Sequence, residues 1–284
     1  MFKFNSKSLK TASVFSTISV HSPHYEYLLL TRAINDAVPE WFAVNDTSSI
    51  IIRHGKCSDN VSTDKIYGFH KKTIKMINML MPMMDEDQMK LWGEDVSMPE
   101  LVLENSPSIL YHEYQDPITV DQHIHGLLDS RIEFGYDLRT TKSNGFKVVL
   151  DRNAVMAATK GLRALKSLSE IRDGVDVVDV VVSNAATHRD YSLNLHYESE
   201  SANQRISIPF AAHPNHSEFP KPQYFVIKRL LFIFDVVLRM KPEGVLNLWV
   251  DGTHENSPIS MEFKSTYGDE VSIIARPFGK NHQL

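Results

Sequence analysis

The sequence contains a single cysteine, Cys57, so the chain cannot form an internal disulfide and lacks a second thiolate for a cysteine zinc site. No apolar run approaches the roughly 18 residues that a membrane span requires. The N-terminus also lacks the apolar segment that is typical of a secretory signal. These absences predict a cytoplasmic protein with no membrane partner.

Positive charge is also scarce, because the formal net charge is −5 at pH 7. A protein that coats DNA through bulk positive charge is therefore disfavoured, since phosphate binding needs Lys and Arg against the backbone. If DNA is a partner, the cations must be concentrated on part of the surface.

Sequence motifs for common chemistry are missing as well. The chain has no GxxxxGK[ST], GxGxxG, GxSxG or HExxH, which argues against an enzyme and against a bound cofactor. The histidine groups 123/125 with 112, and 213/216, could suggest a metal, and so could the acidic run 85–87. Without a cysteine or a fixed carboxylate beside the histidines, we favour solvated loops and predict no metal site.

The residues that are present predict two α+β domains. Hydrophobic residues make up 42% of the 284, enough for two cores. In the C-terminal half, a strand at 146–150 and a helix at 152–168 precede strands at 177–183, 191–198 and 205–210. The order then repeats, with a strand at 224–227, a helix at 229–240 and strands at 245–250, 259–265 and 271–275.

The N-terminal half follows the same order. We expect a strand at 2–5, a helix at 6–18 and strands at 25–32, 41–45 and 50–54; then a strand at 65–69, a helix at 70–84 and strands at 101–104, 109–114 and 132–138. Four β-α-β-β-β units make an internal repeat in element order. We place an N-terminal domain at 1–138, a polar linker at 139–145 and a C-terminal domain at 146–284.

Cations gather on one side of the expected helices, opposite their apolar residues. A single such helix would be read as an ordinary solvated face, but recurrence across the units favours a surface that binds DNA phosphates without reading bases. The candidate DNA-facing residues are Lys7, Lys10, Lys71, Lys72, Lys75, Arg152, Lys160, Arg163, Lys166, Arg229 and Arg239. The fourth helix is the weakest case, since it is apolar nearly all round.

With these elements in place, the sequence resembles the DNA sliding clamps, and more narrowly the clamp of T-even-type bacteriophages. The most specific match is Leu30-Thr31-Arg32-Ala33-Ile34-Asn35 at the end of a long strand. Further short matches are Asp116-Pro117, Met240-Lys241-Pro242 with Gly244, and Leu246-Asn247-Leu248-Trp249. Two segments, 85–99 and 121–131, are longer than in the phage pattern and could lengthen an outer loop or bind a partner.

The resemblance implies the DNA clamp fold: a ring of six similar domains with helices lining the hole and antiparallel sheets outside. Three copies would form a homotrimer, joined head to tail through edge strands, for which 50–54 or 177–183 is our guess. The implied function is that of a non-catalytic processivity factor in viral DNA replication, in the cytoplasm of a phage-infected host. Implied partners are double-stranded DNA, the replicative DNA polymerase, an ATP-dependent clamp loader and transcription co-activators.

In clamps, a polymerase docks a short peptide beside the linker and the C-terminal strands, which here points to Tyr136, Leu138, Pro277 and Phe278. Packing at the edge of the core remains open for Phe278. An alternative to the clamp is a non-catalytic single-strand-binding or virus structural protein. The former needs stacking aromatics in a basic groove, and the expected basic helices carry almost none.

Overall fold

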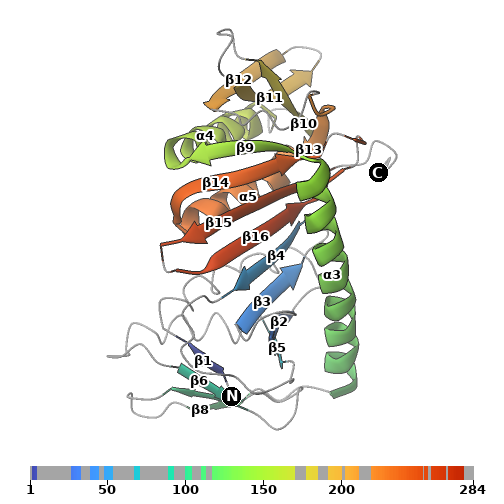
Figure 1. Ribbon diagram of the computed structural model, residues 1–284, viewed down its shortest axis with the longest axis vertical. Coiled ribbons are helices and arrows are strands. Elements are labelled where there is room, and N and C mark those ends of the chain that lie inside the picture. Colours follow the sequence, from blue (N-terminus) through green and yellow to red (C-terminus); the bar gives the residue numbers. More distant parts are fainter. Residues whose placement is uncertain are drawn as a thin grey trace. The chain divides into compact units, whose positions relative to one another are not determined.

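We describe a computed structural model of the chain (Figure 1). It describes residues 2–4, 27–32, 39–44, 48–53, 67–70, 89–92, 100–103, 110–112, 117–169, 177–184, 191–199, 202–210, 219–251, 253–254, 257–258, 259–266 and 268–277. The chain divides into two compact units, one of residues 1–134 with 265–272 and one of 135–264 with 273–284.

The second unit, together with residues 265–272 that are assigned to the first, contains the expected β-α-β-β-β order twice. The first run is β9 (Phe146–Asp151), α4 (Arg152–Ser169), β10 (Val177–Asn184), β11 (Tyr191–Ser199) and β12 (Ala202–Phe210). The second is β13 (Gln223–Val226), α5 (Ile227–Arg239), β14 (Pro242–Val250), β15 (Ile259–Ser265) and β16 (Glu270–Ala275). The sequence prediction is confirmed for all ten elements, with shifts of a few residues at their ends.

The two runs exchange strands. β9, the first strand of one run, pairs antiparallel with β14 of the other, and β13 pairs in the same way with β10. The strand orders are therefore β12-β11-β10-β13 in one sheet and β15-β14-β9 in the other. Because β10 lies between β11 and β13, the guess that 177–183 is an edge strand is wrong. The end strands of this sheet, among the described residues, are β12 and β13.

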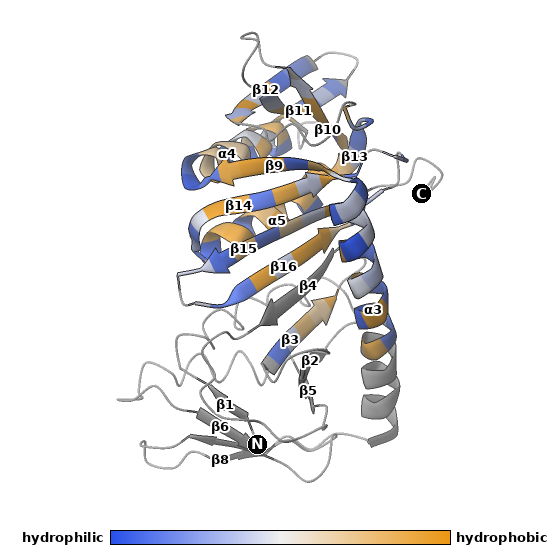
Figure 2. Ribbon diagram, in the orientation of Figure 1, coloured by the Kyte–Doolittle hydropathy of each residue, from blue (hydrophilic) through white to orange (hydrophobic). Residues whose placement is uncertain are grey.

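The core of this unit lies between the sheets and the helices. Along β9, buried residues alternate with half-buried ones, as a strand with one covered face requires. Figure 2 shows apolar residues along β9, β14 and α5. Fully buried members come from the strands and both helices, among them Val148, Leu162, Val178, Val237 and Leu248.

The first unit has the same exchanged pairing. Its strands are β1 (Phe2–Phe4), β2 (Tyr27–Arg32), β3 (Pro39–Val44), β4 (Ser48–Arg53), β5 (Tyr67–His70), β6 (Met89–Trp92), β7 (Glu100–Leu103) and β8 (Leu110–His112). β1 pairs with β6, as β9 pairs with β14 in the second unit. β5 pairs with β2, as β13 pairs with β10. The expected helices at 6–18 and 70–84 lie outside the described residues, apart from His70 at the end of β5.

Residues 117–144 form α3 (Pro117–Asn144), a helix of 28 residues. The predicted strand at 132–138 is therefore wrong, and so is the loop conformation expected for the linker at 139–145. The three strands that follow the expected helix of that repeat are β6, β7 and β8, and β6 lies inside the long segment 85–99. The other long segment, 121–131, is helical. A domain division at 139–145 stays a prediction.

Contacts in the middle of α3 and near its C-terminal end hold the helix in place. Within the first unit, the Phe134 ring meets Phe42 edge to face at a centroid distance of 6.0 Å, and Arg131 Nε donates to Glu40 Oε1 at 2.7 Å. Within the second unit, Lys142 Nζ lies 2.9 Å from Glu262 Oε2 and 5.1 Å from the Trp249 ring centroid. These contacts stabilise a helix whose own sequence shows only weak helical periodicity.

The sheet β12-β11-β10-β13 carries a buried polar network centred on Asn194. This side chain is 1% exposed, and its Nδ2 donates to Ser183 Oγ at 2.9 Å. Its Oδ1 accepts hydrogen bonds from Arg205 Nε at 3.0 Å and from Ser207 Oγ at 2.6 Å. The network ties β10, β11 and β12 together by side chains as well as by their backbone ladders.

Candidate nucleic-acid interface

Helix α4 separates its cations from its apolar residues, as the sequence predicts. Val155, Ala158, Leu162 and Leu165 are at most 1% exposed and pack into the unit, with contacts to β9, β12 and β14. The cationic residues lie on the remaining surface: Arg152, Lys160 and Arg163 are exposed and Lys166 is half-buried. The helix thus presents positive charge on the side away from the core.

The start and middle of α4 are fixed by local contacts. Asp151 accepts a hydrogen bond from the backbone N of Ala154 at 2.7 Å, which caps the first turn. At Gly161 an added Cβ would lie 2.6 Å from Ile206 Cδ1, so the missing side chain lets the helix approach β12 closely. The exposed cations are therefore carried by a helix with a defined position in its unit.

Helix α5 is more apolar than α4 but also has a charged side. Seven of its residues are buried, including Leu230, Phe234 and Val237. Arg229 and Arg239, the two residues predicted to face DNA, are exposed, and so is Lys228. The expectation that this helix is apolar nearly all round understates its charge.

The two helices pack against each other and together form a basic surface. Their sequences contain seven Lys and Arg residues and one acid, Asp235, in a chain whose formal net charge is −5. Arg163 Nη2 lies 2.6 Å from Asp235 Oδ1 and thereby joins α4 to α5. We call this α4–α5 surface the basic face. Such a surface suits phosphate contacts without base readout.

The other predicted DNA-facing residues, Lys7, Lys10, Lys71, Lys72 and Lys75, lie outside the described residues. The structure therefore places the six predicted positions of the second unit on two helices that pack against each other. Sequence reasoning did not single out Asp235. The signal available in the sequence was that Asp235 is a lone acid on a helix with several cations. Its partner, Arg163, lies 72 residues away in the chain, so the sequence does not indicate the pair.

Two of the residues predicted to form a peptide pocket lie on a different kind of element from the one expected. Tyr136 and Leu138 lie on α3 and not on a strand; Tyr136 is 65% exposed, and Leu138 and Pro277 are half-buried. Arg276 Nη2 lies 3.2 Å from Asp137 Oδ2, which puts the end of β16 beside this part of α3. Phe278 lies outside the described residues.

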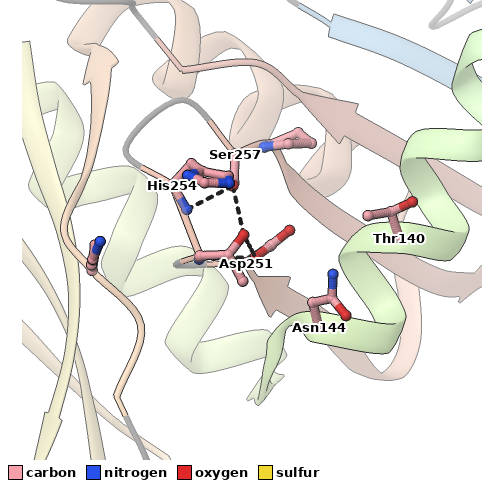
Figure 3. A pocket seen from close by; sticks show the side chains of 8 residues that line it. Thr140, Asn144, Asp251, His254 and Ser257 are labelled. Atoms are coloured by element: carbon pink, nitrogen blue, oxygen red, sulfur yellow. Dashed lines mark hydrogen bonds between the residues drawn. The ribbon is translucent and has the colours of Figure 1, made fainter.

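A cavity of about 850 Å³ lies beside the C-terminal end of α3. Figure 3 shows Thr140 and Asn144 of α3 on one side and Asp251, His254 and Ser257 of the loop after β14 on the other. Tyr136, Thr140 and Asn144 are spaced four residues apart, so they share one side of the helix. Sequence reasoning read this loop only as a turn and missed the cavity.

The loop contains Asp, His and Ser side chains, but their hydrogen bonds stabilise a turn. Asp251 Oδ1 accepts from Thr253 N at 3.0 Å and from Thr253 Oγ1 at 2.8 Å. Ser257 Oγ accepts from the backbone N of His254 at 3.2 Å, so this bond does not involve the imidazole ring. A nucleophile and base would need the ring nitrogen on the hydroxyl.

Two features are absent from the described residues. None of the helices there combines the length and the apolar content needed to cross a bilayer. In the same part of the chain, no three His, Cys, Asp or Glu side chains are grouped so that they could hold a metal ion.

Comparisons with known proteins identify the fold. No protein-family model matches the sequence, and no curated protein matches it. Solved structures do match. The DNA polymerase sliding clamp from Caulobacter crescentus superposes with a TM-score of 0.65 at 13% identity, over 98% of this chain and 65% of that one. A. fulgidus PCNA, solved with the C-terminal region of FEN-1 bound, gives 0.56 at 14% identity, over 99% and 100%.

The chain thus spans about 65% of the length of the bacterial clamps it resembles, including the clamp of Streptococcus pyogenes, which matches with a TM-score of 0.63 at 11% identity over 97% of this chain. Identities this low establish the architecture alone. The predicted fold class is confirmed: the chain has the DNA clamp fold, with antiparallel sheets and helices in α+β units.

Proposed function

We propose that the chain is one subunit of a DNA sliding clamp, a non-catalytic ring that encircles duplex DNA and tethers a replicative polymerase for processive synthesis. The basic face carries this proposal, because it concentrates cations on helices in a chain that is acidic overall and has the clamp fold. A ring holds DNA by topology, so weak and unspecific phosphate contacts are sufficient and leave it free to slide.

The same proposal includes self-association. Each chain supplies two units that share the exchanged strand pairing, and a ring of six such domains needs three copies, joined by heterologous contacts that close on rotation. β12 and β8 are edge strands of their sheets in the described part of the chain, and both could pair with a neighbouring copy. Sedimentation tests this step: a monomer at micromolar concentration would contradict the ring.

We further propose that the polymerase docks a peptide along the side of α3 that carries Tyr136, Thr140 and Asn144, with the adjoining cavity as the anchor point. An exposed aromatic next to a hollow is a common anchor for short segments. The predicted pocket residues Leu138, Pro277 and Phe278 belong to the same proposal. We expect Tyr136→Ala to reduce polymerase stimulation and to leave DNA binding unchanged.

The resemblance to T-even-type phage clamps supports finer parts of the proposal: a homotrimer, viral replication in the cytoplasm of an infected host, an ATP-dependent loader, and transcription co-activators as further partners. Only clamp-type architecture is shared with the solved neighbours, so these parts rest on the sequence matches at 30–35, 116–117 and 240–249. Reconstitution with a phage-type loader and polymerase tests them.

The experiment that tests the DNA interface compares two double variants of equal net charge. Arg152→Gln with Lys160→Gln removes two exposed cations of the basic face, whereas Lys221→Gln with Lys264→Gln removes two exposed cations elsewhere in the second unit. Binding to a short duplex is measured against salt concentration.

We expect the first variant to weaken binding and to lower the salt slope by up to roughly 0.9 for each cation that contacts a phosphate. The second variant should behave like the wild type. Equal effects of the two variants would show that the basic face is not where DNA binds.

A further inference from the structure

The ion pair between Arg163 and Asp235 has a consequence for the basic face. Arg163 is the more accessible partner, with 60% of its side chain exposed, while 27% of the Asp235 side chain is exposed. The carboxylate thus lies lower, at the contact of α4 with α5, and the guanidinium lies above it within reach of solvent. A ligand that approaches from solvent meets Arg163 with its charge already compensated.

Arginine is the cation that would hold a phosphate most firmly. Its planar guanidinium can form two parallel hydrogen bonds to one phosphate, which a lysine ammonium cannot do. A sliding protein needs contacts that break easily at each step along the DNA. An acid that competes for Arg163 would weaken that contact.

We propose that Asp235 is an attenuating residue: it competes with DNA phosphate for Arg163 and keeps the affinity of the basic face low. This inference rests on the proposed function, since it assumes that the basic face meets DNA. Asp235 is the one acidic residue in the sequences of α4 and α5, and its Oδ1 lies 2.6 Å from Arg163 Nη2. Arg163 is largely exposed and Asp235 is partly exposed, so the pair contributes little to folding stability. Its effect is expected on binding.

The test uses the full chain and a short linear duplex, with affinity measured by fluorescence anisotropy over a range of salt concentrations. Asp235→Asn keeps the shape of the side chain and removes its charge. Glu198→Gln is the matched control, because it removes one exposed acid from β11, outside the basic face. Arg163→Gln, alone and combined with Asp235→Asn, completes a double-mutant cycle.

Asp235→Asn should tighten DNA binding by several-fold, up to about eightfold at roughly 0.1 M salt. The reason is that one further phosphate contact changes the logarithm of the binding constant by roughly 0.9 for each tenfold change in salt concentration. The salt slope should become steeper by the same 0.9 or less. In the Arg163→Gln background, Asp235→Asn should have no larger effect than Glu198→Gln. The steeper slope distinguishes this role from a merely structural one.

Three results would overturn the attenuating role. Asp235→Asn could match Glu198→Gln, it could weaken binding, or it could tighten binding equally with and without Arg163, in which case the carboxylate acts on phosphate by itself. The proposed function is tested separately by Arg152→Gln with Lys160→Gln. If that variant loses affinity while Asp235→Asn changes nothing, the inference fails and the DNA interface stands.

Discussion

Replacing Gly145 with alanine should destabilise the second unit through a clash that the surrounding structure cannot easily relieve. Gly145 joins the end of α3 to β9, and its backbone N donates to Thr141 O at 2.7 Å. An added Cβ would lie 2.3 Å from Thr141 O, 3.0 Å from Trp249 Cβ and 3.4 Å from Asp251 N. Two of these three atoms belong to the backbone, so relief requires the last turn of α3 to move away from β14.

The cost can be worked from these contacts. Forcing a methyl group into a packed site costs about 1–3 kcal/mol, and the backbone overlap puts this case at about 3 kcal/mol. Replacing glycine also lowers the conformational entropy of the unfolded chain, which stabilises the folded variant by about 0.4–1 kcal/mol. We therefore expect a net loss of about 2 kcal/mol, or a fall in Tm of about 4–8 °C for a domain of this size.

Urea unfolding followed by tryptophan fluorescence measures this loss, since Trp249 lies beside the substituted position. Gly161→Ala is the matched control. Its Cβ would meet only side-chain atoms of Ile206, with Cδ1 at 2.6 Å and Cγ2 at 3.1 Å, and alanine gains about 1 kcal/mol of helix propensity that offsets part of this clash. If Gly145→Ala proved as stable as the wild type, or Gly161→Ala the less stable of the two, the steric argument would be refuted.

Further predictions concern buried polar groups and helix α3. Asn194→Ala should cost about 2–3 kcal/mol in the free energy of unfolding, because Arg205 and its neighbours lose a buried acceptor; thermal melts measure it. Arg131→Met should cost about 3 kcal/mol, since it leaves the Glu40 carboxylate, 1% exposed, without that cation, and adding Glu40→Gln should recover most of the loss in urea titrations. Gly135→Ala should stabilise α3 by about 0.5–1 kcal/mol in calorimetry, as nothing lies within 4 Å of the new Cβ.

The second unit could be predicted from sequence because its signals are local and agree with one another. In α4, the helical period separates Leu162 and Leu165 from Lys160 and Arg163, and the structure buries the first pair and exposes the second. Turn residues bound each strand of this unit. The four repeats were predicted in the same way, and the exchanged strand pairing repeats in both units.

Helix α3 could not be predicted, because its local pattern favours a strand. Apolar residues alternate at Ile132, Phe134 and Tyr136, which is the period of a half-buried strand. In the structure Phe134 is 1% exposed, whereas Ile132 is 67% and Tyr136 is 65% exposed, so the alternation does not mark a buried side. Phe134 packs on Phe42, far away in sequence, and contacts of this kind override a weak local preference.

The position of a candidate residue could be predicted only where it depends on that residue's own helix. The cations of α4 could be placed from periodicity alone, whereas the pairing of Arg163 with Asp235 depends on how α4 packs against α5. The cavity is formed by α3 and a loop more than 100 residues further along the chain, around Asp251. Neither arrangement can be predicted from the residues of a single helix or loop.

The exchange of strands between the two halves of the second unit affects how the protein folds during synthesis. β9 ends at Asp151, but its partner β14 begins at Pro242, so its ladder cannot form until roughly 90 further residues have left the ribosome. At about 5–20 residues per second this is a delay of about 5–20 s, during which the edge of β9 is exposed. Long-range pairing of this kind also slows folding in a free chain. Chaperones would therefore be needed most while residues 146–250 are being made.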